Sequence, residues 1–205
     1  MKNSYLISAL LLTGAILTSC NSSSKLTDNI DGTWSSVPEN VVYNDSISIE
    51  IIKTFEFAPA DKNSGTVIIS GMISMERIVP PSEYDSVSII NPLTVTAAAV
   101  ASVQGTFEAV SHDRIELKLA PSTYSFNLDD EAVYYDFNLL TAGATPEPGV
   151  LKPTFADFFR HNASEPVRKA LLGTEEITHI NFHDGMAACN INGLDITLRK
   201  QLSTE

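Results

Sequence analysis

The chain has 205 residues, a formal net charge of −12 at pH 7 and a hydrophobic content of 43%. This acidic balance argues against nucleic-acid binding, because phosphate contacts depend on clustered Lys and Arg and the sequence has no such cluster. The length predicts one domain that buries most of the surface its unfolded chain exposes.

The first 20 residues have the pattern of a secretion signal. Lys2 precedes an apolar run from Tyr5 to Leu17, which is shorter than the about 20 residues that a transmembrane helix needs. Leu17-Thr18-Ser19-Cys20 resembles a bacterial lipobox, in which the cysteine receives a diacylglycerol group and the freed amine a further acyl chain. The resemblance implies a membrane anchor at Cys20, since several acyl chains hold a protein stably. An ordinary secretion signal with a chance cysteine is the alternative.

Residues 20–29 are polar and small at their start, which predicts a flexible tether. Residue 21 is not Asp, and by resemblance to lipoprotein sorting rules this favours the outer membrane over the inner one. Some lipoproteins of the Bacteroides group reach the cell surface through an acidic cluster after the cysteine, and that cluster is missing here. We therefore expect a periplasmic-facing protein with a signal peptide at 1–19, a tether at 20–29 and one domain at 30–205.

Long alternating segments follow and predict antiparallel strands. Residues 46–57 alternate apolar and polar side chains, with Ile52 and Lys53 as exceptions. A second strand is predicted at 66–79, with a bend or bulge at Gly71, and a third at 93–110. The third contains Ala97–Ala101, which we assign to a strand because Val and Thr flank it. Small side chains on its inner face leave room for a large neighbour or for a ligand.

Shorter elements complete the pattern. Strands are predicted at 114–119, 123–128 and 132–138, and a loop at 141–153. Two short helices come next, one behind Thr154 as N-cap and one behind Ser164 as N-cap, with Pro166 in its first turn and Gly173 as its end.

The chain ends in three predicted strands, at 175–183, 186–191 and 194–200. Asp184-Gly185 and Asn192-Gly193 are two-residue turns of the type that tight hairpins need. About ten strands with one helical insertion predict an all-β fold, an antiparallel barrel first and a sandwich second.

Gly32-Thr33-Trp34 opens the strand pattern, and Gly105-Thr106-Phe107 lies in its middle. These residues resemble the lipocalins, and more closely the lipocalin-like lipoproteins of the Bacteroides group. The resemblance implies a calycin-type β-barrel in which Trp34 lies under a basic side chain of the last strand. Arg199 is the matching residue and Lys200 the second candidate, and a cation over an indole ring is worth roughly 0.5–2 kcal/mol. This contact between Trp34 and the basic side chain would have a structural role.

Two features depart from the lipocalin pattern. Their second motif, Thr-Asp-Tyr, is only faintly matched by Tyr135-Asp136-Phe137, and the helical insertion precedes the final strands. Both departures weaken the case for a transport role like that of the lipocalins.

The sequence predicts a protein without catalytic activity, cofactor or metal. No nucleophile elbow, phosphate loop or dinucleotide fingerprint is present. His179 and His183 lie too far apart along one strand, about 13 Å, to share a metal, and neither His112 nor His161 completes a site. Asp129-Asp130-Glu131 is interpreted as a charged turn because it lacks the spacing of a calcium loop. Acylation of Cys20 would leave Cys189 as the only thiol, a small buried apolar residue.

Two functions follow from these expectations. The first is binding of a small hydrophobic or amphipathic ligand inside the barrel. The candidate lining residues share an apolar character and are Ala97, Ala99, Ala101, Tyr134, Phe137, Phe155, Phe158 and Phe159. The second is a non-enzymatic interaction module, such as an envelope assembly factor or a proteinase inhibitor. A connected apolar pocket favours the first and a core filled by side chains the second.

Two tripeptides predict modification. Asp45-Ser46-Ile47 and Asp85-Ser86-Val87 resemble the acceptor used for O-glycosylation of exported proteins in the Bacteroides group. Both lie in turn-like stretches where a sugar on Ser46 or Ser86 would cost the core nothing.

Overall fold

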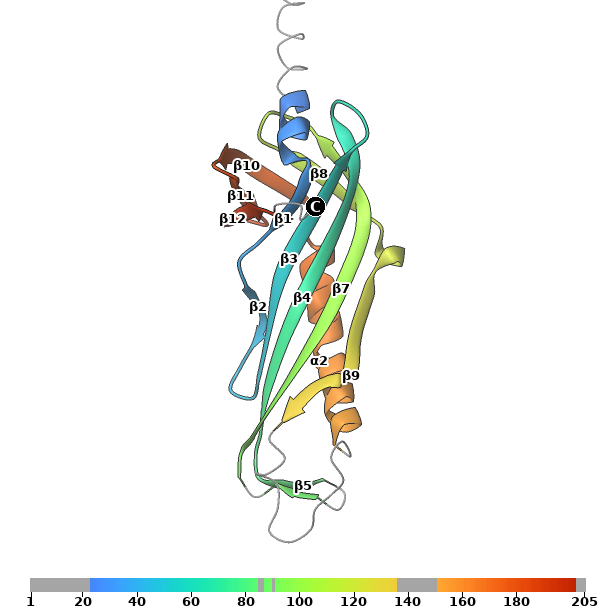
Figure 1. The fold of residues 1–205 in the computed structure, drawn as a ribbon, viewed down its shortest axis with the longest axis vertical. Helices are drawn as coiled ribbons and strands as arrows, with labels where there is room; N and C mark the ends of the chain where they lie inside the picture. Colours follow the sequence, from blue (N-terminus) through green and yellow to red (C-terminus); the bar gives the residue numbers. More distant parts are fainter. Residues whose placement is uncertain (1–22, 85–86, 90, 136–150, 202–205) are drawn as a thin grey trace, which may run out of the picture.

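The computed structural model describes residues 23–84, 87–89, 91–135 and 151–201. Three long strands determine its shape, β3 (Ile47–Pro59), β4 (Ser64–Val79) and β7 (Leu93–Ala109). They pair antiparallel along their lengths and run from the top of the molecule to its bottom (Figure 1). At about 3.3 Å per residue, β4 alone extends over about 50 Å.

The upper part of the molecule is a closed barrel. The long strands are joined there by β8 (Ile115–Leu119), β10 (Glu176–His183), β11 (Met186–Ile191), β12 (Leu194–Lys200) and β1 (Gly32–Ser35). Because β1 pairs with both β12 and β3, the described strands form a ring of eight. The predicted all-β, lipocalin-like antiparallel barrel with a helical insertion is confirmed, and the sandwich alternative is wrong.

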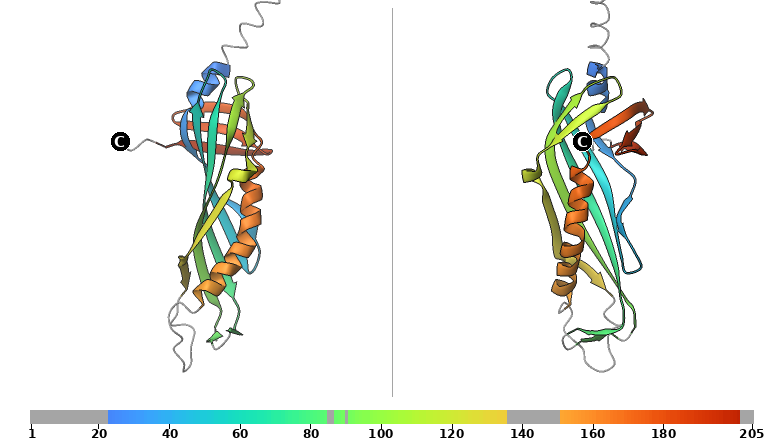
Figure 2. Two further views of the ribbon diagram at one scale, coloured as in Figure 1. Left: turned by 90° about the vertical axis from the view of Figure 1, so that its right-hand side faces the viewer. Right: turned by 180° about the vertical axis from the view of Figure 1, so that it is seen from behind.

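The lower part is an open sheet that curves around a helix. Below β1 and β8, the edges of β3 and β7 are taken over by β2 (Glu39–Tyr43) and β9 (Ser125–Tyr135). Helix α2 (Lys152–Leu172) packs against β9, β7, β4, β3 and β2 and runs lengthwise beside the sheet (Figure 2). A two-stranded β5 (Ser82–Tyr84) and β6 (Val87–Ile89) lies at the bottom, and the 3-10 turn η1 (Pro121–Thr123) precedes β9.

Helix α2 is one continuous helix, so the prediction of two short ones is wrong. Leu151, not Thr154, is the N-cap residue, and Ser164 lies inside the helix together with Pro166. An interior proline costs about 3 kcal/mol. The helix continues because its buried side chains recur every four residues on both sides of the proline: Phe155, Phe159, Ala163, Val167 and Leu171. Burial of this stripe outweighs the local penalty.

Strand β9 is also continuous, where two strands and a turn at Asp129–Glu131 were expected. Its pairing with β7 shifts between Ala97 and Ala99, and this irregularity accommodates the acidic residues without reversing the chain. Of the bend or bulge predicted at Gly71, the bulge is wrong, since β4 stays in register with both neighbours there. A Cβ at Gly71 would lie 2.6 Å from Ile51 Cδ1, so the glycine serves close packing.

Aromatic side chains fill the interior of the barrel. Trp34, Phe55, Phe57 and Phe107 are each at most 2% exposed. The rings of Phe57 and Phe107 meet edge to face with centroids 5.3 Å apart, a geometry that stabilises beyond simple burial. The barrel therefore has a packed core.

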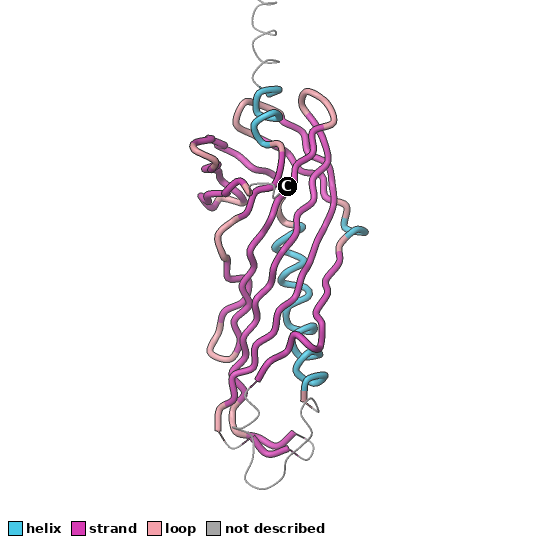
Figure 3. The backbone as a smooth tube through the Cα atoms, in the orientation of Figure 1, coloured by secondary structure: helices cyan, strands magenta, loops and turns pink. Residues whose placement is uncertain are grey.

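The upper end of the barrel is capped by a helix at residues 23–30, where a flexible tether was expected (Figure 3). Leu26 and Ile30 are 2% and 1% exposed, and their spacing of four residues places both on one helix face. Ser23 Oγ donates a hydrogen bond of 2.9 Å to Asn63 Oδ1 in the turn between β3 and β4. The polar composition of this segment concealed its two apolar anchors.

Candidate functional site

Trp34 lies at the capped end of the barrel and links three elements. Its Nε1 donates a 2.6 Å hydrogen bond to the carbonyl oxygen of Ile30, and Lys200 Nζ lies 5.3 Å from the centre of its ring. Arg199 is exposed and lies opposite Ser35, so the first-choice partner was wrong and the second candidate holds the position. Side chains alternate along β12, and Lys200 shares the face of the buried Leu198.

The predicted ligand lining belongs mostly to the core between sheet and helix. Ala97, Ala99 and Ala101 are among the buried side chains of β7, and α2 packs against this strand. Phe155 and Phe159 are fully buried on α2. The room that the alanines leave is therefore taken by a large neighbour, the helix.

The remaining predicted lining residues are more exposed or undescribed. Phe158 is half-buried, with the guanidinium carbon of Arg77 3.5 Å from the centre of its ring. Tyr134 is 65% exposed and faces away from the core. Phe137 lies outside the described residues.

A cleft of about 710 Å³ opens on the outer side of the barrel, where β8 and β10 separate. The two strands pair only at Ile115–Glu116 with Ile177–Glu176. Beyond this pair, one further hydrogen bond of 2.8 Å joins Leu117 N to the carbonyl oxygen of Glu175. Residues 173 and 174 lead to this point from the end of α2, and the cleft lies where they diverge from β8.

The cleft has an apolar floor and a charged rim. Leu117 is buried, and Leu119 and Leu172 are half-buried in its wall. On the rim, Arg114 Nη2 lies 3.0 Å from Glu116 Oε1 and 2.9 Å from Glu176 Oε2. All three side chains are about half exposed, so these ion pairs are weak and exchangeable. The arrangement suits a molecule with one apolar and one polar part.

The rim carries like charges on neighbouring strands. Glu116 lies directly opposite Glu108 on one side and Glu176 on the other, and directly opposed like charges destabilise a sheet. Arg114 offsets part of this repulsion by bridging Glu116 and Glu176. A second hollow of about 390 Å³ shares Glu116 and Lys118 with the cleft, so the outer face of β8 forms a wall between the two.

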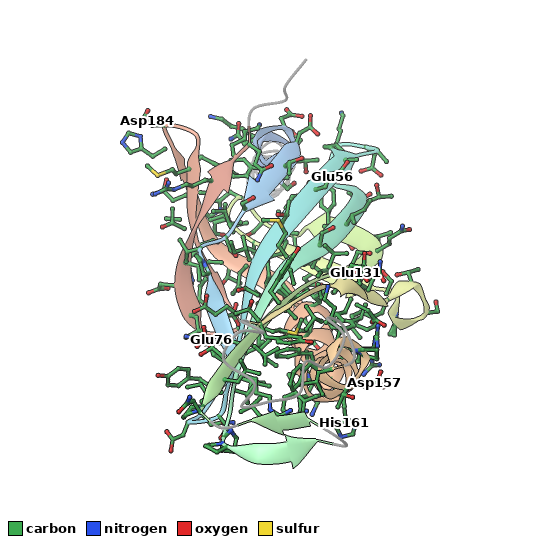
Figure 4. All side chains as sticks on the ribbon, turned by 60° about the horizontal axis from the view of Figure 1, so that its bottom comes forward. Glu56, Glu76, Glu131, Asp157, His161 and Asp184 are labelled. Atoms are coloured by element: carbon green, nitrogen blue, oxygen red, sulfur yellow. The ribbon has the colours of Figure 1, made fainter. Side chains whose placement is uncertain are left out.

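The acidic residues of β9 hold α2. Arg160 donates to Asp130 and to the carbonyl oxygen of Leu128, and Lys152 Nζ lies 2.9 Å from Glu131 Oε2. The hydrogen bond that Arg160 donates to Asp130 raises the pKa of Arg160, and the one that Lys152 donates to Glu131 raises the pKa of Lys152. Seen from the lower end, Glu131, Asp157 and His161 lie on this side of the molecule (Figure 4). The predicted charged turn is thus a docking point for a helix.

Side chains capable of nucleophilic or metal chemistry are dispersed. His112, His161, His179 and His183 are all exposed, and no three His, Cys, Asp or Glu side chains of the described segments gather as a metal site. Cys189 is a buried free thiol, and its burial raises its pKa to about 12. It is therefore protonated at neutral pH and a poor nucleophile.

A buried lysine interrupts the apolar face of β3. Lys53 is 5% exposed and points inward in phase with Ile51 and Phe55. Its Nζ lies 3.0 Å from Glu39 Oε2 on β2. This ion pair could have been predicted from the sequence. Lys53 occupies an inward position in the alternation of residues 46–57, and a buried lysine requires a carboxylate partner.

Comparisons with known proteins add no assignment: no family model, curated protein or solved structure matches the chain.

Among the described residues, no helix combines the length and apolarity needed to cross a membrane. Cys20 and Ser86 lie outside the described residues, and Ser46 is exposed in the turn before β3. Lipidation and glycosylation remain predictions.

Proposed function

We propose that the chain is a lipid-anchored protein of the cell envelope that binds a small amphipathic ligand without catalysing a reaction. The single observation that carries the binding role is the cleft between β8, β10 and the end of α2. Its volume of about 710 Å³ falls in the usual range of small-molecule sites, about 300–1,000 Å³. Because aromatic side chains fill the barrel, the ligand site is proposed on its outer side.

The proposed location depends on Cys20. The lipobox-like residues before it support acylation and attachment to the outer membrane, with the protein facing the periplasm. Cys20→Ala should abolish metabolic labelling with palmitate and leave an uncleaved or soluble form. Labelling that persists in this variant would contradict the anchor.

The ligand site is tested with a fluorescent fatty-acid probe, dansyl-undecanoic acid, titrated into protein without its acyl chains. Leu119→Asp and Leu172→Asp each place a charge in the apolar wall and should weaken probe binding at least tenfold. Leu194→Asp is the matched control, because Leu194 is 63% exposed and does not line the cleft. Equal affinity for all three variants and the unaltered protein would contradict binding in the cleft.

The second candidate function is a protein-interaction module. It is favoured by apolar side chains in register on the outer face of the long strands, Ile52 beside Met72 and Met72 beside Val100. Met72 and Val100 are 60% and 55% exposed. Neighbouring apolar side chains that are exposed to water are typical of protein-interaction surfaces. Native mass spectrometry of delipidated protein from its own host distinguishes the candidates: a bound small mass supports the first and a bound polypeptide the second.

A further inference from the structure

We infer that the capped end of the barrel faces the membrane, so that the long strands direct the opposite end of the molecule away from it. The capped end consists of helix 23–30, the β3–β4 turn at 60–63 and the β7–β8 turn at 110–114. This inference rests on the proposed acylation of Cys20. It names the surface that meets lipid, which the anchor alone does not.

The chain is fixed to the barrel from Ser23 onward, three positions after Cys20. Ser23, Leu26, Thr27 and Ile30 are each at most 6% exposed. Polar contacts fix both ends of the helix, from Ser23 Oγ to Asn63 Oδ1 at 2.9 Å and from Trp34 Nε1 to the oxygen of Ile30 at 2.6 Å. Releasing this helix would expose two large apolar side chains, Leu26 and Ile30, to water, which is unfavourable.

The covalent chain keeps Cys20 close to the barrel. Ser23 lies three positions after Cys20, and an extended chain spans at most about 3.6 Å per residue, which gives about 11 Å. Ser23 contacts Asn63 in the β3–β4 turn. An acyl chain on Cys20 therefore holds this turn within a short distance of the lipid headgroups.

The elongated shape of the molecule separates its two ends. Strand β4 begins at Ser64, next to that turn, and ends at Val79, about 50 Å away along the strand. Leu93, the first residue of β7, pairs with Val79 at the far end. The helix cap and the β5–β6 strands lie at opposite ends of the long axis (Figure 1). Anchoring at one end therefore places the other end far from the bilayer.

The charge of the capped end differs from that of the whole chain. The chain has a net charge of −12, and a surface with that sign is repelled by anionic lipid. The capped end differs, because its three segments carry Lys25, Lys62 and Arg114 against Asp28, Asp61 and Asp113. Val110, at the same end, is 43% exposed. A balanced surface with an exposed apolar side chain meets headgroups without the repulsion expected from the whole molecule.

The test uses the full-length lipidated protein in vesicles of phosphatidylcholine and phosphatidylglycerol that contain a headgroup-attached nitroxide lipid. A fluorophore is placed on Lys62→Cys at the capped end or on Asn91→Cys at the far end, each in a Cys189→Ala background. We expect several-fold stronger quenching at position 62 than at position 91. A second form of each labelled variant carries a flexible Gly-Ser segment of about twelve residues before Ser23. In this form, most of the difference in quenching between positions 62 and 91 should disappear.

The outcomes separate the inference from the proposed function. Intact mass establishes whether the acyl chains are present. If they are absent, the proposed anchor fails and the orientation fails with it. If they are present and quenching at positions 62 and 91 is equal, the anchor stands and the orientation is overturned. Stronger quenching at position 62 that the inserted segment abolishes supports the inference.

Discussion

Trp34 shows at the residue scale how one side chain connects the two ends of the described chain. Trp34→Ala should lower the free energy of unfolding by about 3–5 kcal/mol, as expected for a large core truncation. Lys200→Ala should cost about 0.5–1 kcal/mol through loss of the cation over the indole ring. Urea unfolding measures both changes.

A double-mutant cycle of Trp34→Leu with Lys200→Ala isolates the interaction between ring and cation, because leucine has no aromatic face. Arg199→Ala is the matched control and should leave stability unchanged, because Arg199 is exposed. Coupling of Trp34 to Arg199 instead of Lys200 would contradict the observed geometry.

Asp61 supports a prediction on pH. Its carboxylate accepts hydrogen bonds from Asn63 N, Ser64 N and Ser64 Oγ at 2.8–2.9 Å. These bonds, that from Asn63 first, lower the pKa of Asp61 below its ordinary value of 3.8. The folded state thus binds this proton less readily than the unfolded state. The stabilisation is complete above pH 3.8 and is lost as the pH falls through the lowered folded-state pKa.

The stability difference between the unaltered protein and Asp61→Ala should therefore be constant near neutral pH and shrink below pH 3.8. Lys62→Ala, in the same turn, serves as control and should show no such narrowing. Urea titrations at a series of pH values give the comparison. A difference that stays constant down to about pH 2 would mean that the carboxylate hydrogen bonds do not form.

At the scale of elements, the interface between β7 and α2 determines whether a ligand finds room inside. Ala99→Leu adds bulk to the buried face and should cost about 1–3 kcal/mol by overpacking. Ala98→Leu is the matched control, because Ala98 is exposed on the other face of the same strand, and its effect should stay within about 0.5 kcal/mol. If thermal unfolding shows both variants equally stable, the space beneath β7 is vacant and an interior ligand site returns as the better proposal.

The elements also show what could be predicted from the sequence. The alternation of residues 46–57 and the two-residue turns after His183 and Ile191 have direct local signals, and the structure contains these strands and turns. The continuity of α2 has none, because Pro166 and Ser164 favour an interruption locally and the sheet decides otherwise. Strand β2 was missed because its five residues, Glu39–Tyr43, depend on pairing with β3.

The candidate site was the least predictable part. The cleft forms where β8 and β10 cease to pair, and no local pattern indicates where two strands distant in sequence separate. Leu119 and Leu172 lie 53 positions apart in the chain and meet in the cleft only because the end of α2 returns to the barrel. Of the expected lining, Ala97, Ala99, Ala101, Phe155 and Phe159 are buried, but they belong to the core between β7 and α2 and not to a cavity.

At the scale of the whole molecule, the helical cap should contribute to stability, which a tether would not. A chain beginning at Asp31 should unfold at a clearly lower temperature than a chain beginning at Ser23, since loss of Leu26 alone is worth about 2–5 kcal/mol. Leu26→Ala in the longer chain should account for much of the difference, and Lys25→Ala for none of it. Calorimetry with both chains makes the comparison. Equal melting temperatures would mean that residues 23–30 are not held against the barrel.

The three long strands belong to both parts of the molecule, and this sharing has a consequence for cooperativity. Strands β3, β4 and β7 supply walls of the upper barrel and also the sheet that holds α2. If the backbone hydrogen bonds between β3 and β4 break in one part of the molecule, the same two strands lose their support in the other part. The two parts therefore cannot melt as independent foldons. A single transition, with equal calorimetric and van't Hoff enthalpies, is the thermodynamic signature of such shared strands.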